Sequence, residues 1–389
     1  MVESLKPLGR DQRLDFFRGL VLFFIFVDHI PDNFLSNFTL QAVGFSDSAE
    51  VFFFISGYAA ILVYAPAMER QGSLVASARI LHRAWQLYVA HIFLFMIFTA
   101  AVAYTVQKFN NPLYNEEMRV GDFLSEPHVA IIKTLLLQFQ PPFLDILPVY
   151  IILLAIFPLV LIGLHASAGA VLGLSFMVYA TVQFYNVTLP SYPEGDVWQF
   201  NPFAWQFLFV IGATCGYAQL RGRWAAWAGG RMNTLLVGAA IALVVVAGVI
   251  QISWTIHWVW SRFPPLLLEA LFPINKTNLS PLRLVHFLAL ALVVARCIGK
   301  DSTLVRSRWV APIVRCGRNS LPIFCLGILL SLIGHFLLVE FSGGLLMQSS
   351  INLAGVTAMI AMAALLDWYK QAGRQAPGAS ALQAMPNAE

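Results

Sequence analysis

Charged residues are scarce in this sequence. Asp, Glu, Lys and Arg together make up 11% of the 389 residues, whereas hydrophobic residues make up 59% and the mean hydropathy is +0.72. Soluble domains contain about 25% charged residues, so this composition excludes a soluble globular protein. The net charge of +4 is small and gives no reason to expect a nucleic-acid partner. The composition predicts a polytopic protein embedded in a lipid bilayer.

Motifs of several common chemistries are also missing. The sequence contains no GxxxxGK[ST] loop, no GxGxxG, no GxSxG and no HExxH. Its four cysteines lie in or beside apolar segments without CxxC or Cys/His spacing, so neither a metal site nor a disulfide is expected. The sequence therefore contains no recognisable motif for nucleotide hydrolysis, redox chemistry or zinc binding, and no tightly bound cofactor is predicted.

Long apolar runs recur along the chain. A helix that crosses a bilayer needs about 20 such residues, and the predicted fold class is an all-α polytopic membrane protein with about ten transmembrane helices. The runs lie near residues 16–37, 48–66, 83–106, 146–164, 168–186, 202–220, 232–254, 282–299, 319–340 and 346–369. Residues 10–370 are thus predicted to form one membrane domain, between an N-terminal cytoplasmic segment (1–9) and a flexible cytoplasmic tail (371–389).

Basic residues predict the orientation. With the N-terminus in the cytoplasm, sixteen Lys and Arg residues fall in inner segments and six in outer segments. Positive charge is enriched on the cytoplasmic side of membrane proteins, so both termini are expected inside. No small-residue cleavage site follows the first apolar run, which is therefore expected to be retained. Two outer loops, roughly 107–145 and 255–281, either shape an acceptor site or are ordinary connections.

The first apolar run carries the first candidate site. Arg18 and His29 are eleven residues apart, which is almost three helical turns, so they share one helix face over about 16 Å. An acyl-CoA entering from the cytosol fits this spacing, with phosphates at Arg18 and the thioester near His29. Histidine is a suitable general base for a sugar hydroxyl. The alternative is that His29 bonds a neighbouring helix and Arg18 snorkels to the interface.

Acidic residues follow across a short outer loop. Asp47 is expected to cap the second span, and Glu50 lies in its first turn. Glu50 is predicted to orient His29 and to stabilise its charged form, as the carboxylate does in other base-assisted acyl transfers. Simple capping explains Asp47 at least as well. Asp28 points about 100° away from His29 and is ranked below Glu50, so Asp28 and Asp47 are assigned as acceptor contacts.

Basic turns at the inner ends of other spans are candidate CoA contacts. Arg79, His82 and Arg83 share one helical stripe, and Arg318 and Asn319 precede the ninth span. Anchoring at the cytoplasmic interface explains the arginines equally well. His335 is placed towards the outer side as an acceptor contact.

Six segments together resemble the OpgC family of glucan succinyltransferases, which is related to the family-three membrane acyltransferases. They are RLDFFRG (13–19), DHIP (28–31), AEVFFFISGY (49–58), LHRAWQLY (81–88), FNPFAWQF (200–207) and GRNSLP (317–322). The resemblance extends from about residue 10 to residue 369. It includes Trp205 and Gln206, which are assigned as candidate acceptor contacts.

The resemblance implies a bacterial inner-membrane enzyme that moves succinyl, or another short acyl group, from cytosolic acyl-CoA to periplasmic glucans. The family's essential histidine maps onto His29 and its arginine onto Arg18. A transporter or flippase for a sugar or lipid-linked glycan is the alternative, because buried charges also line transport pathways. The absence of an inverted repeat in the sequence argues against a transporter.

Overall fold

Helices dominate the structure. The computed structural model describes residues 10–109, 118–222, 231–255, 274–299, 302–341 and 343–375. Within these ranges there is no strand, and Phe139 and Tyr192 form an isolated β-bridge. Eight helices of the described part are long and apolar enough to cross a membrane, which makes the chain a multi-pass membrane protein. The predicted segment 1–9 and parts of both predicted outer loops (110–117 and 256–273) lie outside the described residues.

All ten predicted runs contain a helix. The eight candidate spans are α2 (Ser48–Gln71), α3 (Ser73–Phe109), α7 (Ile146–Ala166), α8 (Ala168–Tyr185), α9 (Pro202–Leu220), α11 (Arg231–Thr255), α17 (Ser320–Glu340) and α18 (Leu345–Gln375). The remaining two runs hold α1 (Gln12–Asp28) and α14 (Pro281–Cys297), of 17 residues each. That length is the lower end of the range for a spanning helix.

The predicted extent of the first run is wrong. α1 ends at Asp28 rather than near residue 37, and His29 is its C-terminal cap. Pro31 follows, and a helix rarely continues through the residue before a proline. Asp32 then takes a left-handed conformation (φ 54°), and two short 3₁₀ helices, η1 (Phe34–Phe38) and η2 (Leu40–Ala42), lead to α2. Asp28 and His29 therefore stand at the end of the helix and not inside it.

Short helices in the connections were not predicted. The connection between α3 and α7 contains α5 (Val120–Ser125) and α6 (Pro127–Leu135), and the one between α14 and α17 contains α15 (Thr303–Arg306) and α16 (Ala311–Arg318). Each is too short to register in a search for spanning runs. The prediction of a flexible tail from residue 371 is also wrong at its start, because α18 continues to Gln375, and residues 376–389 lie outside the described residues.

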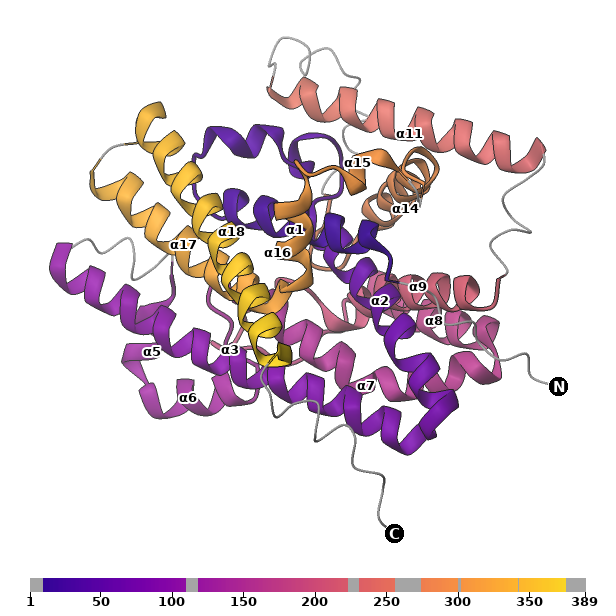
Figure 1. Cartoon of the computed structure of the whole chain (residues 1–389). Coiled ribbons are helices and arrows are strands. Elements are labelled where there is room, and N and C mark those ends of the chain that lie inside the picture. Colours follow the sequence, from indigo (N-terminus) through magenta and orange to yellow (C-terminus); the bar gives the residue numbers. More distant parts are fainter. Residues whose placement is uncertain are drawn as a thin grey trace.

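α1 lies near the centre of the bundle, against α2, α16 and α17 (Figure 1). Glycines let the central backbones approach closely. A Cβ added at Gly317 of α16 would lie 1.8 Å from the carbonyl oxygen of Asp15, and one added at Gly212 of α9 would lie 2.1 Å from that of Phe54 on α2. Small residues at such crossings are a general means of packing helices in membranes. These contacts hold α1 and α2, the two helices that carry the candidate site.

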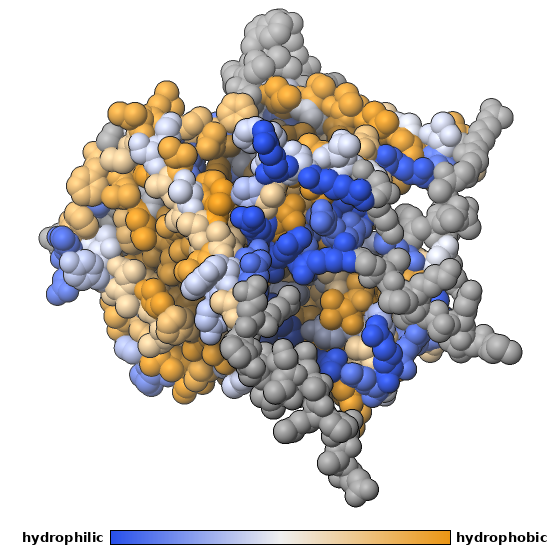
Figure 2. All heavy atoms as spheres, viewed as in Figure 1, coloured by the Kyte–Doolittle hydropathy of each residue, from blue (hydrophilic) through white to orange (hydrophobic). Residues whose placement is uncertain are grey.

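Hydrophobic side chains cover the outer helices on the face shown in Figure 2, and hydrophilic side chains gather over α1, α15 and α16. At this polar region the carboxylate of Asp15, in the first turn of α1, contacts Arg10 at 2.6 Å and Arg318 of α16 at 3.7 Å. The basic end of α16 is thereby tied to the start of α1.

Candidate active site

Two cavities follow one another along the same helices. From α1, Arg18, Val21 and Leu22 line the Arg18 cavity, of about 190 Å³. Ile25, Asp28 and His29 line the His29 cavity, of about 530 Å³. On α2, Ala49 lines the His29 cavity and Val51 lines the Arg18 cavity. On α7, Ile146 lines the His29 cavity and Leu147 lines the Arg18 cavity. The ring of Phe324 on α17 lines both cavities. The helix face that carries Arg18 and His29 therefore borders both cavities, and Phe324 lies where the two cavities meet.

The Arg18 cavity is cationic. Arg18 and Arg83 line it together with the hydroxyl groups of Ser56, Ser320, Tyr64 and Tyr150, and its lining, as far as the structure describes it, includes no Asp or Glu. The two guanidinium groups are close enough for their charges to interact. The charge of Asp15 also acts on Arg18, but Asp15 is not in the described lining. Cations in a cavity whose described lining holds no acid favour the binding of an anion, and guanidinium groups suit phosphate in particular.

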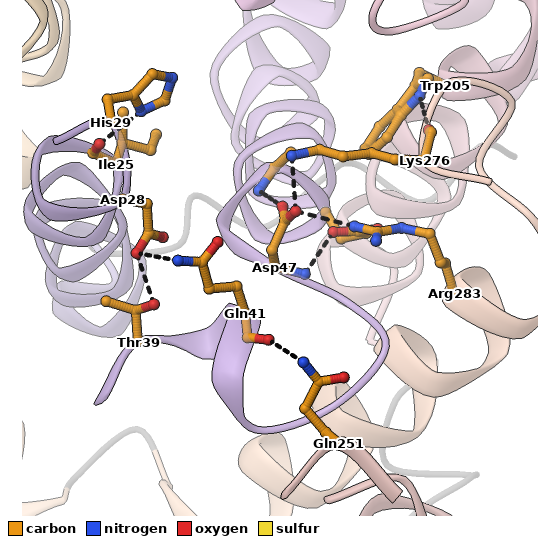
Figure 3. Close-up of polar contacts among 12 residues, drawn as sticks. Ile25, Asp28, His29, Thr39, Gln41, Asp47, Trp205, Gln251, Lys276 and Arg283 are labelled. Atoms are coloured by element: carbon orange, nitrogen blue, oxygen red, sulfur yellow. Dashed lines mark hydrogen bonds and ion pairs between the residues drawn. The ribbon is translucent and has the colours of Figure 1, made fainter. Parts of the chain in front are cut away.

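His29 is positioned for proton transfer by its own helix. Its Nδ1 lies 2.7 Å from the carbonyl oxygen of Ile25, and its ring packs against Phe143 with the centroids 5.1 Å apart. A carbonyl oxygen can only accept a hydrogen bond, so Nδ1 carries the proton and Nε2 keeps its lone pair. Figure 3 shows this bond at the end of α1. The helix end thus presents an imidazole in the tautomer that a base requires.

The described lining of the His29 cavity includes four carboxylates, those of Asp28, Asp47, Asp145 and Asp196. Asp28 accepts hydrogen bonds from Thr39 at 2.7 Å and Gln41 at 3.1 Å. Both donors belong to the connection between α1 and α2, so this connection holds the carboxylate in place. Asp145 precedes α7 and interacts electrostatically with His29. Burial raises the pKa of the Asp145 carboxyl, and the charge of His29 counteracts this rise. A negative Asp145 and a positive His29 therefore stabilise each other.

A cluster of four charged residues, called here the charge cluster, fixes the start of α2. Asp47 contacts Lys276 at 2.8 Å and Arg283 of α14 at 3.1 Å, and Glu50 contacts Arg283 at 2.7 Å. Burial alone would raise the pKa of Asp47, but Lys276 and Arg283 outweigh burial and hold the pKa below its usual range. Burial would likewise lower the pKa of Lys276, and Asp47 raises it above its usual value. Asp47 and Lys276 are thus held as ions.

The structure gives Glu50 a different partner from the predicted one. Its Oε1 accepts from Arg283, and its Oε2 accepts the backbone N–H of Asp47 at 2.8 Å in a capping box. Glu50 is fully buried and is not in the described lining of the His29 cavity. The expectation that Glu50 orients His29 is therefore corrected: the Ile25 carbonyl orients the ring. Asp47 caps α2, as expected, and also lines the cavity.

The motif around Trp205 supports the segment that carries Lys276. The indole Nε1 of Trp205 donates to the carbonyl oxygens of Lys276 at 3.2 Å and Thr277 at 3.0 Å, and the backbone N–H of Asn201 donates to the carbonyl oxygen of Thr277 at 2.9 Å. Gln206 is buried and pairs with Ser175 at 2.6 Å. Trp205 and Gln206 therefore lie behind the cavity wall and do not line the cavity.

Only some of the basic residues predicted to bind CoA line the Arg18 cavity. Of the residues predicted for CoA, Arg18 and Arg83 line the Arg18 cavity, whereas Arg79 and His82 are exposed on α3. Gln86 joins Arg83 and His82, at 3.0 and 3.1 Å. Arg318, also exposed, reaches Asp15, away from the cavity lining.

Two further predicted residues lie in the packing of the bundle. Asn319 is buried and its amide binds Asp367 at 2.9 Å and Lys370, both on α18. His335 is buried on α17, and neither residue is in the described lining of the two cavities. Asn319 therefore joins α17 to α18, and its contacts do not support the predicted role in binding CoA.

Sequence reasoning missed Asp145, Lys276, Arg283 and Phe324. Lys276 and Arg283 were counted only as charges of an outer loop, and Asp145 was the polar residue before an apolar run. One signal was present in the sequence, because an Arg at the start of an apolar run needs a partner where that run lies in a membrane. The identity of that partner depends on how distant helices pack.

Replacement of Arg283 by Met is expected to destabilise the protein strongly. Removal of one member of a buried ion pair leaves the other charge uncompensated and typically costs about 3–5 kcal/mol. Thermal unfolding of the detergent-purified protein measures the change. Arg296→Met, on the exposed part of the same helix, is the control and should have little effect. The double variant Glu50→Gln/Arg283→Met should recover part of the loss, and additivity of the two single changes would contradict the pairing.

Comparison with known families gives one match over nearly the whole chain. The family model described as OpgC protein matches residues 10–371. Searches of the curated proteins and of the solved structures gave no significant match. The matched range covers both cavities and all the residues that line them.

Proposed function

The chain belongs to the OpgC family, and we propose that it is an O-acyltransferase that moves a succinyl group from cytosolic acyl-CoA to hydroxyl groups of periplasmic glucans. Family membership implies glucan succinylation. The observation that carries the mechanism is the pair of consecutive cavities, one whose described lining holds two arginines and no acid, and one with a histidine base. Their contrast fits a reaction between an anionic donor and a neutral, hydroxyl-rich acceptor.

We propose that the enzyme lies in the bacterial inner membrane with ten spans, the eight candidates together with α1 and α14. Residues 10–370 form the membrane domain, with both termini in the cytoplasm. The inner excess of Lys and Arg supports this orientation. The Arg18 cavity then faces the cytosol and the His29 cavity the periplasm, as the two substrates require.

In the proposed reaction the phosphates of CoA bind at Arg18 and Arg83, and the acyl thioester reaches past Phe324 to His29. Nε2 of His29 accepts the proton of the glucan hydroxyl while the hydroxyl oxygen attacks the thioester carbonyl carbon. The carbon–sulfur bond then breaks, and the imidazolium returns the proton to the leaving thiolate. An ester and free CoA are the products.

Asp145 supplies the compensating charge in this mechanism. A proton on His29 creates a cation in a largely buried place, which is costly unless an anion lies near it. Asp145 interacts electrostatically with the ring, while Asp28, Asp47 and Lys276 also face the cavity. The carboxylates and the amide of Gln199 can accept or donate hydrogen bonds to sugar hydroxyls.

The variant His29→Gln should abolish succinyl transfer, because it removes the base while keeping a side chain of similar size. The measurement is free CoA released from succinyl-CoA in the presence of a glucan, together with mass spectrometry of the glucan. His128→Gln, exposed on α6, is the matched control. Wild-type transfer by His29→Gln would contradict the assignment, and a wild-type protein that releases no CoA would favour a transporter.

The variant Arg18→Met should weaken binding of the donor and leave the acceptor unaffected. The loss of a charge-assisted contact to phosphate is expected to raise KM for succinyl-CoA by about tenfold or more, with a smaller change in kcat. Arg79→Met removes an exposed arginine outside the cavity lining and serves as the control. Equal effects of the two variants would mean that the Arg18 cavity does not hold CoA.

The variant Asp145→Asn should lower kcat and move the acidic limb of the pH–rate profile to lower pH. Without the negative charge, protonated His29 is less stable, so the neutral base persists at lower pH but accepts a proton less readily. Asp28→Asn, in the same cavity, should cause a smaller displacement because Thr39 and Gln41 hold that carboxylate. An unchanged profile for Asp145→Asn would exclude the coupling.

A further inference from the structure

The described lining of the His29 cavity includes two cations, Arg119 and Lys276, in different electrostatic surroundings. Arg119 is paired with two carboxylates, Asp122 at 3.4 Å and Asp196. Among the described residues Lys276 is paired with Asp47, which also binds Arg283. With every side chain counted as an ion, the group around Arg119 has a formal charge of −1 and the charge cluster around Lys276 has a formal charge of 0. An incoming anion meets less repulsion at Lys276 than at Arg119.

Lys276 is the cation of the charge cluster that faces the cavity. Its side chain is 36% exposed, whereas that of Arg283 is 10% exposed and lies behind it. Figure 3 shows the Lys276 side chain extending across the start of α2, with its ammonium group beside Asp47 on the side nearer to His29. Its charge also acts on both His29 and Asp145. Lys276 therefore lies within electrostatic range of the proposed site of acyl transfer.

The ammonium group is held in place but has donors to spare. Trp205 fixes the backbone of Lys276, and the Nζ atom lies 5.3 Å from the centroid of the Phe200 ring. An ammonium group has three N–H donors, and within the described part of the chain Asp47 accepts one of them. Two donors remain for a ligand, which is the number that a carboxylate can use.

The succinyl group brings a charge into this cavity. It ends in a carboxylate, two methylene groups away from the thioester carbonyl. The cavity is lined by Asp28, Asp47, Asp145 and Asp196, and an anion among carboxylates is disfavoured unless a cation binds it. A neutral acyl group of the same length has no such requirement.

We propose that Lys276 binds the distal carboxylate of the succinyl group and selects a dicarboxylic acyl donor over a neutral one. This inference rests on the proposed function. It also gives a role to the hydrogen bonds of Trp205, which hold the backbone of the segment that carries Lys276. Lys276 is thus a specificity residue, distinct from the base and from the arginines that bind CoA.

The test compares two donors of equal length, succinyl-CoA and butyryl-CoA, with wild-type protein and three variants. For the wild type, kcat/KM should be higher with succinyl-CoA. Lys276→Met should reduce the ratio of the two kcat/KM values by about tenfold or more, and Lys276→Arg should keep most of it. Lys133→Met, on α6 away from the cavity, is the control and should leave the ratio unchanged.

The outcomes separate this inference from the proposed function. If the wild type transfers neither acyl group, the proposed function fails. If it transfers both with equal kcat/KM, or if Lys276→Met keeps the wild-type ratio, only the role of Lys276 is overturned. If Lys276→Met still transfers butyryl, the variant is folded and its loss of succinyl transfer is specific. Should that variant be inactive with both donors, Lys276→Arg decides, because loss of the preference with a charge of the same sign would contradict simple carboxylate binding.

Discussion

The structure depends on the pairing of buried charges at the start of α2. An isolated ion in a lipid-embedded bundle costs several kcal/mol, so Asp47 and Glu50 require cations, and α14 and the segment before it supply Arg283 and Lys276. This requirement joins the start of α2 to a part of the chain more than two hundred residues later. Asp47 and Lys276 of the charge cluster also line the His29 cavity. The pairing that stabilises the start of α2 thus also fixes part of the lining of that cavity.

The two cavities acquire opposite electrostatic character from simple features of the sequence. Arg18 and Arg83 lie among apolar and hydroxyl side chains, without acids in the described lining, whereas four Asp residues gather where helices and loops meet near His29. Asp28, Asp47 and Asp145 stand at helix ends, where Asp47 caps a backbone N–H group and Asp28 accepts from loop residues, whereas Asp196 lies in a loop. A helical bundle can therefore place cations and acids in separate cavities without any additional domain.

Hydropathy alone located a helix in each of the ten apolar runs, because the length and composition of a span are properties of local sequence. The end of α1 was misplaced because Phe34 and Leu35 follow Pro31 and keep the local hydropathy high, and hydropathy does not register the break in backbone hydrogen bonding. Arg18 and His29 could be related to each other because both lie on one helix. Glu50 was given the wrong partner because a carboxylate at a helix start suits either a cap or a distant ion, and only packing distinguishes them.

The position of Phe324 between the two cavities bears on how the membrane potential acts on a charged acyl group. Its ring lines both the cavity proposed to open to the cytosol and the one proposed to open to the periplasm, and in that arrangement part of the membrane potential would fall across the side chains between them. Moving one elementary charge through 100 mV involves about 2.3 kcal/mol. In a membrane that is negative inside, the carboxylate of a succinyl group is driven outward past this ring, whereas an uncharged acyl group is not. The energised membrane would thus favour the delivery of an anionic donor to the outer cavity.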